Sequence, residues 1–182
     1  MKFTQASLPG VWIIDVERHG DSRGYFAETF RAGEFERHVG AVDFVQENES
    51  MSRRGVVRGL HYQAGSSAQA KLVRVVDGTI VDVVVDLRRG SPAFGRHIAV
   101  ELSAENGRQL FVPRGFAHGF AVVSPQAKFL YKVDNYYCPE SERAINIFDS
   151  TLAVEWPFSA VEAIVSQKDA SAGSFDEAEF FD

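Results

Sequence analysis

Cysteine is scarce in this sequence, and long apolar runs are absent. The one cysteine, Cys138, cannot form a disulfide within the chain, which favours a reducing compartment, most simply the cytoplasm. Because Cys138 stands directly before Pro139 with no base beside it, we expect its thiol to be structural. No apolar run reaches the roughly 18 residues of a membrane-spanning helix, and the N-terminal segment lacks the apolar core of a signal peptide. We therefore expect no membrane partner.

Positive charge is also in deficit. The chain has 19 Lys and Arg residues against 25 Asp and Glu residues, a formal net charge of -6. Nucleic acids and anionic membranes are bound by extended positive surfaces, so this balance speaks against both as partners. The glycine-rich nucleotide loops, the G-x-S-x-G nucleophile motif and the H-E-x-x-H zinc motif are absent as well. Any phosphate must therefore be held by side chains.

What the sequence does contain is the composition of one globular domain over residues 1–182, with 45% hydrophobic residues and 15 phenylalanines. Residues 44–156 form a succession of short β-branched and aromatic runs separated by turn signals, which predicts an all-β sandwich or barrel of at least six strands. We expect an N-terminal arm over residues 1–43, with a short helix at 33–39, and a C-terminal tail over 157–182. The tail is predicted to wrap the core, with an amphipathic helix at 158–168 and a polar, frayed end from 170.

One turn signal is especially clear. Two β-branched runs, at residues 71–76 and 79–86, flank the dipeptide Asp77-Gly78. Asp-Gly supplies the positive φ angles of a two-residue type I′ turn, so this segment predicts a β-hairpin.

Two segments place polar residues inside apolar strands. In residues 55–63, Arg58 and His61 are three positions apart and would face opposite sides of a regular strand, but Gly59 between them predicts a bulge that turns both to one face. In residues 111–120, His118 stands among small and aromatic neighbours. Taken singly, each histidine is as readily explained by a hydrogen bond in the core.

Together these segments resemble the paired histidine motifs of the cupin superfamily, in which facing strands of a small β-barrel deliver metal ligands. Gly55 stands six positions before His61 as in the first motif, but Gln63 replaces the second histidine and no glutamate follows. Two imidazoles without a carboxylate fall short of the three protein ligands of a catalytic metal. We therefore expect no metal.

A cupin barrel without a metal can use a histidine as a base. A neutral imidazole is suited to remove a proton from carbon next to a carbonyl when a carboxylate holds its other nitrogen, and Asp169 offers that carboxylate if the tail folds back. Tyr131 offers a proton donor for the opposite face of a substrate, and Lys71 a cation for the developing enolate. Taken singly, they are better explained as a packed strand tyrosine, a snorkelling edge lysine and a solvated tail aspartate.

Several motifs together carry a closer resemblance. They occur in the order Arg58–Gln63, Lys71–Val75, Ser91–Gly95, Glu101–Ser103, Pro113–Phe120, Phe129–Lys132 and Tyr136–Arg143. In this order they resemble the dTDP-4-dehydrorhamnose 3,5-epimerase family over residues 8–169, nearly the whole chain. The resemblance implies a metal-free, cofactor-independent cupin-type jelly roll that acts as a homodimer on a dTDP-linked 4-keto-6-deoxyhexose.

The resemblance also implies roles for individual residues. His61 matches the general base, Tyr131 the general acid and Asp169 the group that orients the base, while Lys71 falls where the enolate is stabilised at the C4 oxygen. The positions that match substrate-binding residues are Arg23, Phe26, Glu28, Gln46, Asn48, Arg58, His118, Tyr137, Glu142 and Lys168. Arginine suits a diphosphate, the two amides suit the edge of thymine, and an aromatic ring can stack on a base. The basic residues Arg23, Arg58, Lys71 and Lys168 are predicted to meet around one diphosphate sugar, counting both protomers.

Two departures from the family pattern stand out, of which the second, beside the expected nucleotide site, bears on substrate scope. The loop of residues 64–70 lacks the usual prolines, and Glu47 and Glu49 replace the more usual aspartate and histidine. The sequence leaves three hypotheses open beside double epimerisation at C3 and C5. They are epimerisation at one carbon only, a non-catalytic sugar-nucleotide binding module, and a metal-dependent cupin dioxygenase or isomerase.

Overall fold

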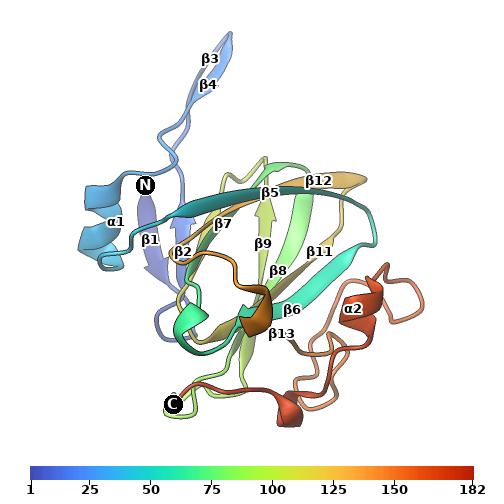
Figure 1. Cartoon of the computed structure of the whole chain (residues 1–182). Helices are drawn as coiled ribbons and strands as arrows, with labels where there is room; N and C mark the ends of the chain where they lie inside the picture. Colours follow the sequence, from blue (N-terminus) through green and yellow to red (C-terminus); the bar gives the residue numbers. More distant parts are fainter.

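A computed structural model describes residues 1–182 (Figure 1). Strands dominate it, in keeping with the β-branched and aromatic runs of the sequence. The strands are β1 (Lys2–Gln5), β2 (Trp12–Asp15), β3 (His19–Asp21), β4 (Gly24–Phe26), β5 (Gln46–Arg53), β6 (Val57–Gln63), β7 (Lys71–Asp77), β8 (Thr79–Asp86), β9 (His97–Ser103), β10 (Gln109–Val112), β11 (Phe116–Val122), β12 (Gln126–Val133) and β13 (Glu142–Ala144). The helices are α1 (Ala32–His38) and α2 (Gln167–Ala170), with 3-10 turns at Gly65–Ser67, Pro139–Ser141 and Phe175–Glu177.

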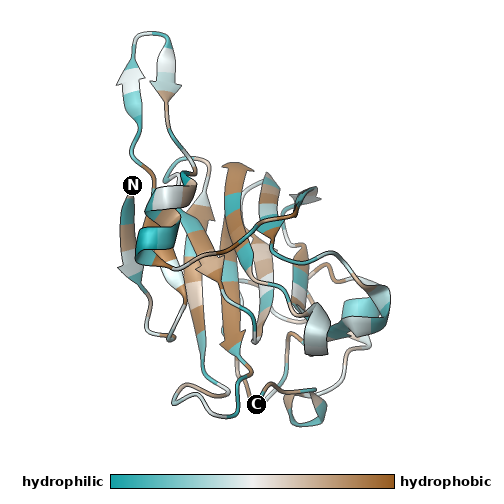
Figure 2. Ribbon diagram, turned by 60° about the vertical axis from the view of Figure 1, so that its left-hand side comes forward, coloured by the Kyte–Doolittle hydropathy of each residue, from teal (hydrophilic) through white to brown (hydrophobic).

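Two antiparallel sheets face each other and form the barrel. One has the order β1-β2-β10-β7-β12-β5, and the other has the order β13-β6-β11-β8-β9. Alternation along β11 shows how the sequence builds both faces: Phe116 and Phe120 point into the space between the sheets, whereas Ala117 and Ala121 lie under the C-terminal tail. Hydrophobic residues colour these central strands brown in Figure 2. The predicted all-β jelly roll is confirmed.

The predicted hairpin at Asp77-Gly78 is wrong. Strand β7 pairs with β10 and β12 in one sheet, whereas β8 pairs with β11 and β9 in the other. Gly78 has φ +78°, and a Cβ on it would lie 2.0 Å from the Gln126 carbonyl oxygen. The dipeptide therefore marks a corner where the chain changes sheets, because a tight positive-φ turn serves a corner as well as a hairpin.

The C-terminal tail wraps the core but differs in detail from the prediction. Helix α2 begins only at Gln167, and most of residues 158–168 is irregular because the segment follows the sheet edge, with reciprocal hydrogen bonds between Ile164 and residues 55 and 57. The end is packed rather than frayed. Phe175 is buried against Phe94 and Phe180, and the Phe181 N–H donates to the Leu87 carbonyl. Apolar contacts thus outweigh the polar composition of this segment.

The N-terminal arm contains the predicted short helix as α1, whose Phe35 packs edge-on against Phe111 of β10. The β3–β4 hairpin stands away from the barrel (Figure 1), with Tyr25 and Phe26 exposed. No helix in the structure is both long and apolar enough to cross a membrane.

Candidate active site

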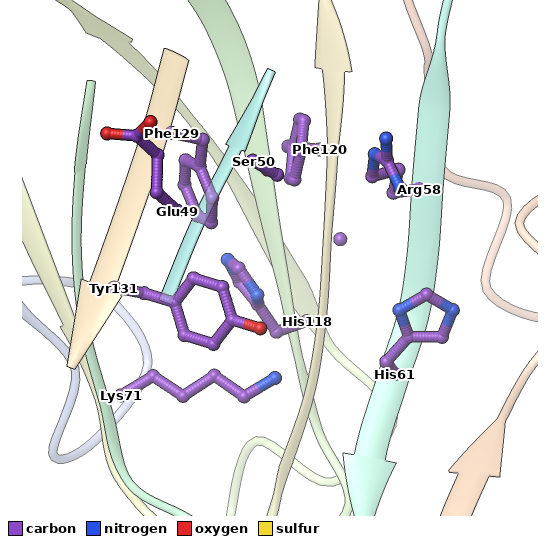
Figure 3. Close-up of a pocket in the computed structure, with 10 residues that line it drawn as sticks. Glu49, Ser50, Arg58, His61, Lys71, His118, Phe120, Phe129 and Tyr131 are labelled. Atoms are coloured by element: carbon purple, nitrogen blue, oxygen red, sulfur yellow. The ribbon is translucent and has the colours of Figure 1, made fainter. Parts of the chain in front are cut away.

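A cavity of about 180 Å³ opens between the two sheets (Figure 3). Its walls combine charged, polar and aromatic side chains from β5, β6, β7, β11 and β12. The lining residues are Glu49, Ser50, Arg58, His61, Lys71, His118, Gly119, Phe120, Phe129 and Tyr131. Residues separated by up to 82 positions in the sequence therefore share one hollow of the barrel.

Arg58 and His61 reach this cavity together because β6 carries the predicted bulge. His61 pairs with His118 and Arg58 with Phe120, so three steps along β6 correspond to two steps along β11. Gly59 adopts φ +137°, and a Cβ on it would lie 2.6 Å from the Gly119 Cα. Glycine is thus required here, where the backbones of β6 and β11 touch.

The imidazole of His61 is held by a carboxylate from the tail. His61 Nε2 lies 2.6 Å from Asp169 Oδ1, and Asp169 is only 4% exposed. Ser166 caps α2 by accepting a hydrogen bond from the Asp169 N–H, which fixes the start of the helix. Burial alone would raise the pKa of Asp169, but hydrogen bonding and charge from His61, with the Gly59 N–H, lower it below its usual value. Asp169 is therefore ionised, and His61 Nε2 carries the proton.

Tyr131 of β12 lies on the other wall, with its hydroxyl turned into the cavity (Figure 3). Burial raises the pKa of Tyr131 above its usual range, against the lowering effects of Asn48 and the charge of Arg58. The phenol therefore keeps its proton at neutral pH. Since His61 comes from one sheet and Tyr131 from the facing sheet, a molecule between them meets a base on one side and an acid on the other.

Lys71 and His118 share a buried carboxylate, Asp82. Both Asp82 oxygens lie 2.9 Å from His118 Nε2, and the residue is fully buried. Burial lowers the pKa of Lys71 to about 8, although the charges of Asp82 and Glu142 work in the opposite direction. Asp82 was missed from the sequence. The available signal was its place inside a valine-rich run, in phase with the inward-facing Ile80 and Val84.

The rim of the cavity carries a second polar cluster. Glu142 Oε2 accepts hydrogen bonds from Tyr137 Oη, at 2.6 Å, and from Lys168 Nζ. Burial would raise the pKa of Glu142, but its bonds to Lys168 and Tyr137 lower it. Nearby on β5, Gln46 Nε2 donates to Asn48 Oδ1 at 2.9 Å. Lys168 also lines a hollow that adjoins the cavity and is bounded by Arg58, His61 and Asp169.

Three predicted residues lie away from both the cavity and its rim in their own chain. Arg23 and Phe26 are on the projecting hairpin, where the Arg23 side chain pairs with Asp21 and is 87% exposed and Phe26 is 72% exposed. Glu28 pairs with Arg31 at 2.7 Å and lines a separate hollow on the outer side of the six-stranded sheet. Of the four basic residues expected to meet, Arg58 and Lys71 line the cavity, Lys168 lines the adjoining hollow, and Arg23 stands apart.

The arrangement is suited to moving protons rather than to holding a metal. No group of three or more His, Cys, Asp and Glu side chains is placed so that it could hold a metal ion. What converges instead is a carboxylate-bound imidazole, a protonated phenol and an ammonium group around a semi-enclosed hollow.

Comparison with known proteins adds independent findings. A family model described as dTDP-4-dehydrorhamnose 3,5-epimerase matches residues 5–177. The dTDP-4-dehydrorhamnose 3,5-epimerase of Salmonella typhimurium is 48% identical over 175 residues, which are 96% of this chain and 95% of the relative.

Two solved structures resemble the fold closely. The dTDP-6-deoxy-D-glucose-3,5-epimerase RmlC of Legionella pneumophila, in complex with dTDP-4-keto-L-rhamnose, superposes with a TM-score of 0.93 at 44% identity, covering 98% of this chain and 94% of that one. ChmJ, a 3'-monoepimerase of Streptomyces bikiniensis in complex with dTDP-quinovose, has a TM-score of 0.86 at 34% identity and covers 93% and 85%. The resemblance noted in the sequence is thereby confirmed, and the chain belongs to the dTDP-4-dehydrorhamnose 3,5-epimerase family.

Proposed function

We propose that this protein is an isomerase that inverts C3 and C5 of dTDP-4-dehydro-6-deoxy-D-glucose to give dTDP-4-dehydro-L-rhamnose. The observation that carries the proposal is the placement of a base and an acid on opposite walls of one cavity. His61, bound to Asp169, comes from the five-stranded sheet, and Tyr131 comes from the six-stranded sheet. Inversion at carbon needs a proton removed from one face and another delivered to the opposite face, which this pair supplies.

The proton removal follows from the state of His61. With Nε2 protonated and donating to Asp169, the lone pair of Nδ1 is the basic position, and Figure 3 shows one ring nitrogen turned toward the cavity. His61 Nδ1 takes the proton from C3 or C5. Both carbons are acidified by the C4 carbonyl, since the electron pair of the broken C–H bond moves to the C4 oxygen as an enolate.

The second half of each inversion uses the facing wall. Lys71 donates a hydrogen bond to the enolate oxygen and compensates its charge. The enolate collapses back to the ketone while Tyr131 Oη gives its proton to the carbon from the other face. Tyr131 then regains a proton from water and His61 releases one, so the site is reset for the second carbon.

The nucleotide is assigned to the rim. Arg58 and Lys168 match the charge of a diphosphate, Gln46 and Asn48 the edge of thymine, and Tyr137 stacks on the base. His118 and Glu142 complete the predicted substrate contacts. In support, these residues form one connected polar region from the cavity wall to its rim.

Arg23, Phe26 and Glu28 are assigned to the site of a partner chain in a homodimer. In support, the hairpin stands away from its own barrel with Tyr25 and Phe26 exposed, and Met51 and Val76 are exposed on the six-stranded sheet. Arg23→Ala and His61→Ala chains, each impaired alone, would be unfolded together and refolded as mixed dimers. If the arm serves the partner, one site of each mixed dimer is intact and activity returns, whereas a site built from a single chain predicts no recovery.

Deuterium incorporation separates double from single epimerisation. Turnover of dTDP-4-dehydro-6-deoxy-D-glucose in deuterium oxide, followed by proton NMR, leaves two solvent-derived deuterons per product if both carbons react. One deuteron supports epimerisation at a single carbon, which the similarity to ChmJ keeps open.

Two further measurements test whether the protein is a binding module or a metal-dependent cupin. A binding module predicts no turnover in the wild type, whereas an epimerase predicts that His61→Ala loses about a hundredfold to ten-thousandfold in kcat. Stoichiometric bound metal, with activity lost on chelation, would favour a metal-dependent cupin.

The cytoplasm is the expected compartment. Cys138 is the one cysteine and its thiol is free, which suits a reducing environment. Cell fractionation tests this, and recovery of the protein from an exported or membrane fraction would contradict it.

A further inference from the structure

Gln63, at the end of β6, makes an unusual set of hydrogen bonds. Its side-chain Nε2 donates to the Ser67 carbonyl at 2.7 Å and to the Tyr136 carbonyl at 3.3 Å, and its Oε1 accepts from the Cys138 N–H at 2.6 Å. The residue is only 5% exposed. Gln63 takes no part in the proton transfers assigned above, so this buried carboxamide needs an explanation of its own.

Two of these bonds hold the peptide groups on either side of Tyr137. The Tyr136 carbonyl belongs to the preceding peptide group and the Cys138 N–H to the following one. The remaining polar group of the preceding peptide, the Tyr137 N–H, donates to Gln46 Oε1 at 3.3 Å. The backbone at Tyr137 is therefore fixed from both sides by buried or half-buried amide side chains of β5 and β6.

The side chain of Tyr137, by contrast, is weakly constrained. The residue is 51% exposed, and its one hydrogen bond runs from Oη to Glu142. An aromatic ring that is not packed depends on its backbone for its position. The hydrogen bonds that Gln63 and Gln46 make to the backbone at Tyr137 therefore constrain where its ring is presented.

Gln63 also joins two loops of the rim, residues 64–70 and 134–141. Other bonds cross between these loops: Asn135 Nδ2 donates to the Ser66 carbonyl at 3.0 Å, and Gln69 Nε2 donates to the Asn135 carbonyl at 2.8 Å. The first loop is the one that departs from the family pattern in lacking prolines. A change in that loop can therefore reach Tyr137 through the same carboxamide.

We propose that Gln63 is a positioning residue for nucleotide recognition: it fixes the backbone at Tyr137 so that the ring is ready to stack on the base. This inference rests on the proposed function, in which Tyr137 contacts the nucleotide. A carboxamide is suited to the task because it accepts from one N–H and donates to two carbonyls at once. A carboxylate of the same shape can only accept, so it repels the Ser67 and Tyr136 carbonyl oxygens.

The test is a double-mutant cycle on the affinity for dTDP, measured by calorimetry with the full-length protein. Gln63→Glu is expected to weaken binding about tenfold to a hundredfold, because two buried hydrogen bonds are lost and two carbonyls face a charge. In the background of Tyr137→Ala, the same change should weaken binding less than about twofold. The value of kcat at saturating substrate should stay within about threefold, because the proton-transfer groups are untouched.

Gln126→Glu is the matched control, since it adds the same charge at an exposed side chain that bonds only Asp77. It should bind dTDP like the wild type. If Gln63→Glu fails to fold, as judged by circular dichroism, the neutral and similarly shaped Gln63→Met takes its place in the cycle.

Lowering the pH gives a second readout that general destabilisation would not reproduce. A protonated glutamic acid has one donor and one acceptor, so the binding defect of Gln63→Glu, taken relative to the wild type at each pH, should shrink as the pH falls from 8 to 6. If Gln63→Glu weakens dTDP binding equally with and without Tyr137, the role of Gln63 is refuted. The same holds if Gln63→Glu does not weaken binding while the wild type binds dTDP. Both outcomes leave the proposed function standing. A wild type that does not bind dTDP overturns the proposed function and this inference with it.

Discussion

Replacing Asp169 by asparagine tests how far the charge of this carboxylate supports His61 as the base. The carboxylate accepts the Nε2–H of His61 at 2.6 Å and faces the positive charge that the imidazole gains when it takes the substrate proton. Asparagine keeps the shape and can still accept a hydrogen bond, but it carries no charge. The variant therefore removes the electrostatic part of the interaction and leaves the packing of α2 in place.

The size of the effect follows from the geometry. Two unit charges whose centres are about 4 Å apart interact by about 4 kcal/mol at an effective dielectric constant near 20. The Asp169 side chain is 5% exposed and that of His61 32%, so solvent screens the pair only in part. Since each 1.4 kcal/mol or so is a factor of ten in rate, Asp169→Asn is expected to lower kcat by about a hundredfold to a thousandfold.

The assay is initial-rate turnover by NMR, with KM determined in parallel. We expect KM to change less than threefold, because Asp169 contacts Nε2 of His61 and not Nδ1, the nitrogen assigned to the substrate. Asp176→Asn, an exposed aspartate of the same tail, is the control and should keep full activity. A loss in kcat of less than about tenfold in a folded Asp169→Asn variant would refute the reasoning, as would a further large loss when the change is added to His61→Ala.

Three other predictions follow from the structure. Tyr131→Phe should lower the rate of epimerisation at least a hundredfold. The substrate should still exchange a C–H proton with deuterium oxide, because His61 remains able to remove and return a proton on its own face. NMR detects both reactions, and loss of exchange would contradict the assignment. Burial lowers the pKa of Lys71 to about 8, so kcat/KM should fall as the pH rises above 8 and the ammonium loses its proton. In Lys71→Arg the fall should move to higher pH, and a wild-type profile that stays flat to pH 10 would count against Lys71. Phe175→Ala should lower the free energy of unfolding by about 3 to 5 kcal/mol, since the ring is buried between Phe94 and Phe180; urea denaturation measures it, and a loss below 1 kcal/mol would mean that the tail is not anchored there.

The sequence predicted the local features of the fold well where one physical constraint dominates. Short β-branched and aromatic runs predicted strands, and Gly59 between Arg58 and His61 predicted the bulge, because no side chain fits where β6 meets β11. The errors share one cause. Asp77-Gly78 and residues 158–168 were assigned from local turn and periodicity signals, but their conformations depend on which distant segment lies beside them.

Only part of the site could be anticipated in the same way. The chemistry of His61, Tyr131 and Asp169 suggested a base, an acid and an orienting carboxylate, and the structure brings these side chains to one cavity and its edge. Asp82 was overlooked because its partner, His118, lies 36 positions away on a different strand. The role of Gln63 was hidden for the same reason, since its partners are backbone groups of two loops that have no signature in the sequence.

The sequence by itself thus determined the all-β class, the bulge in β6, the family and the kinds of chemical group available. Tertiary structure alone decided that β7 and β8 separate into different sheets, that the tail delivers Asp169 to His61, and that the arm leaves Arg23 outside its own cavity. The physical reason is that side-chain periodicity determines which face of a strand is buried, whereas the backbone groups that pair strands are the same in every residue. Which strand lies beside which is settled only when the whole core packs.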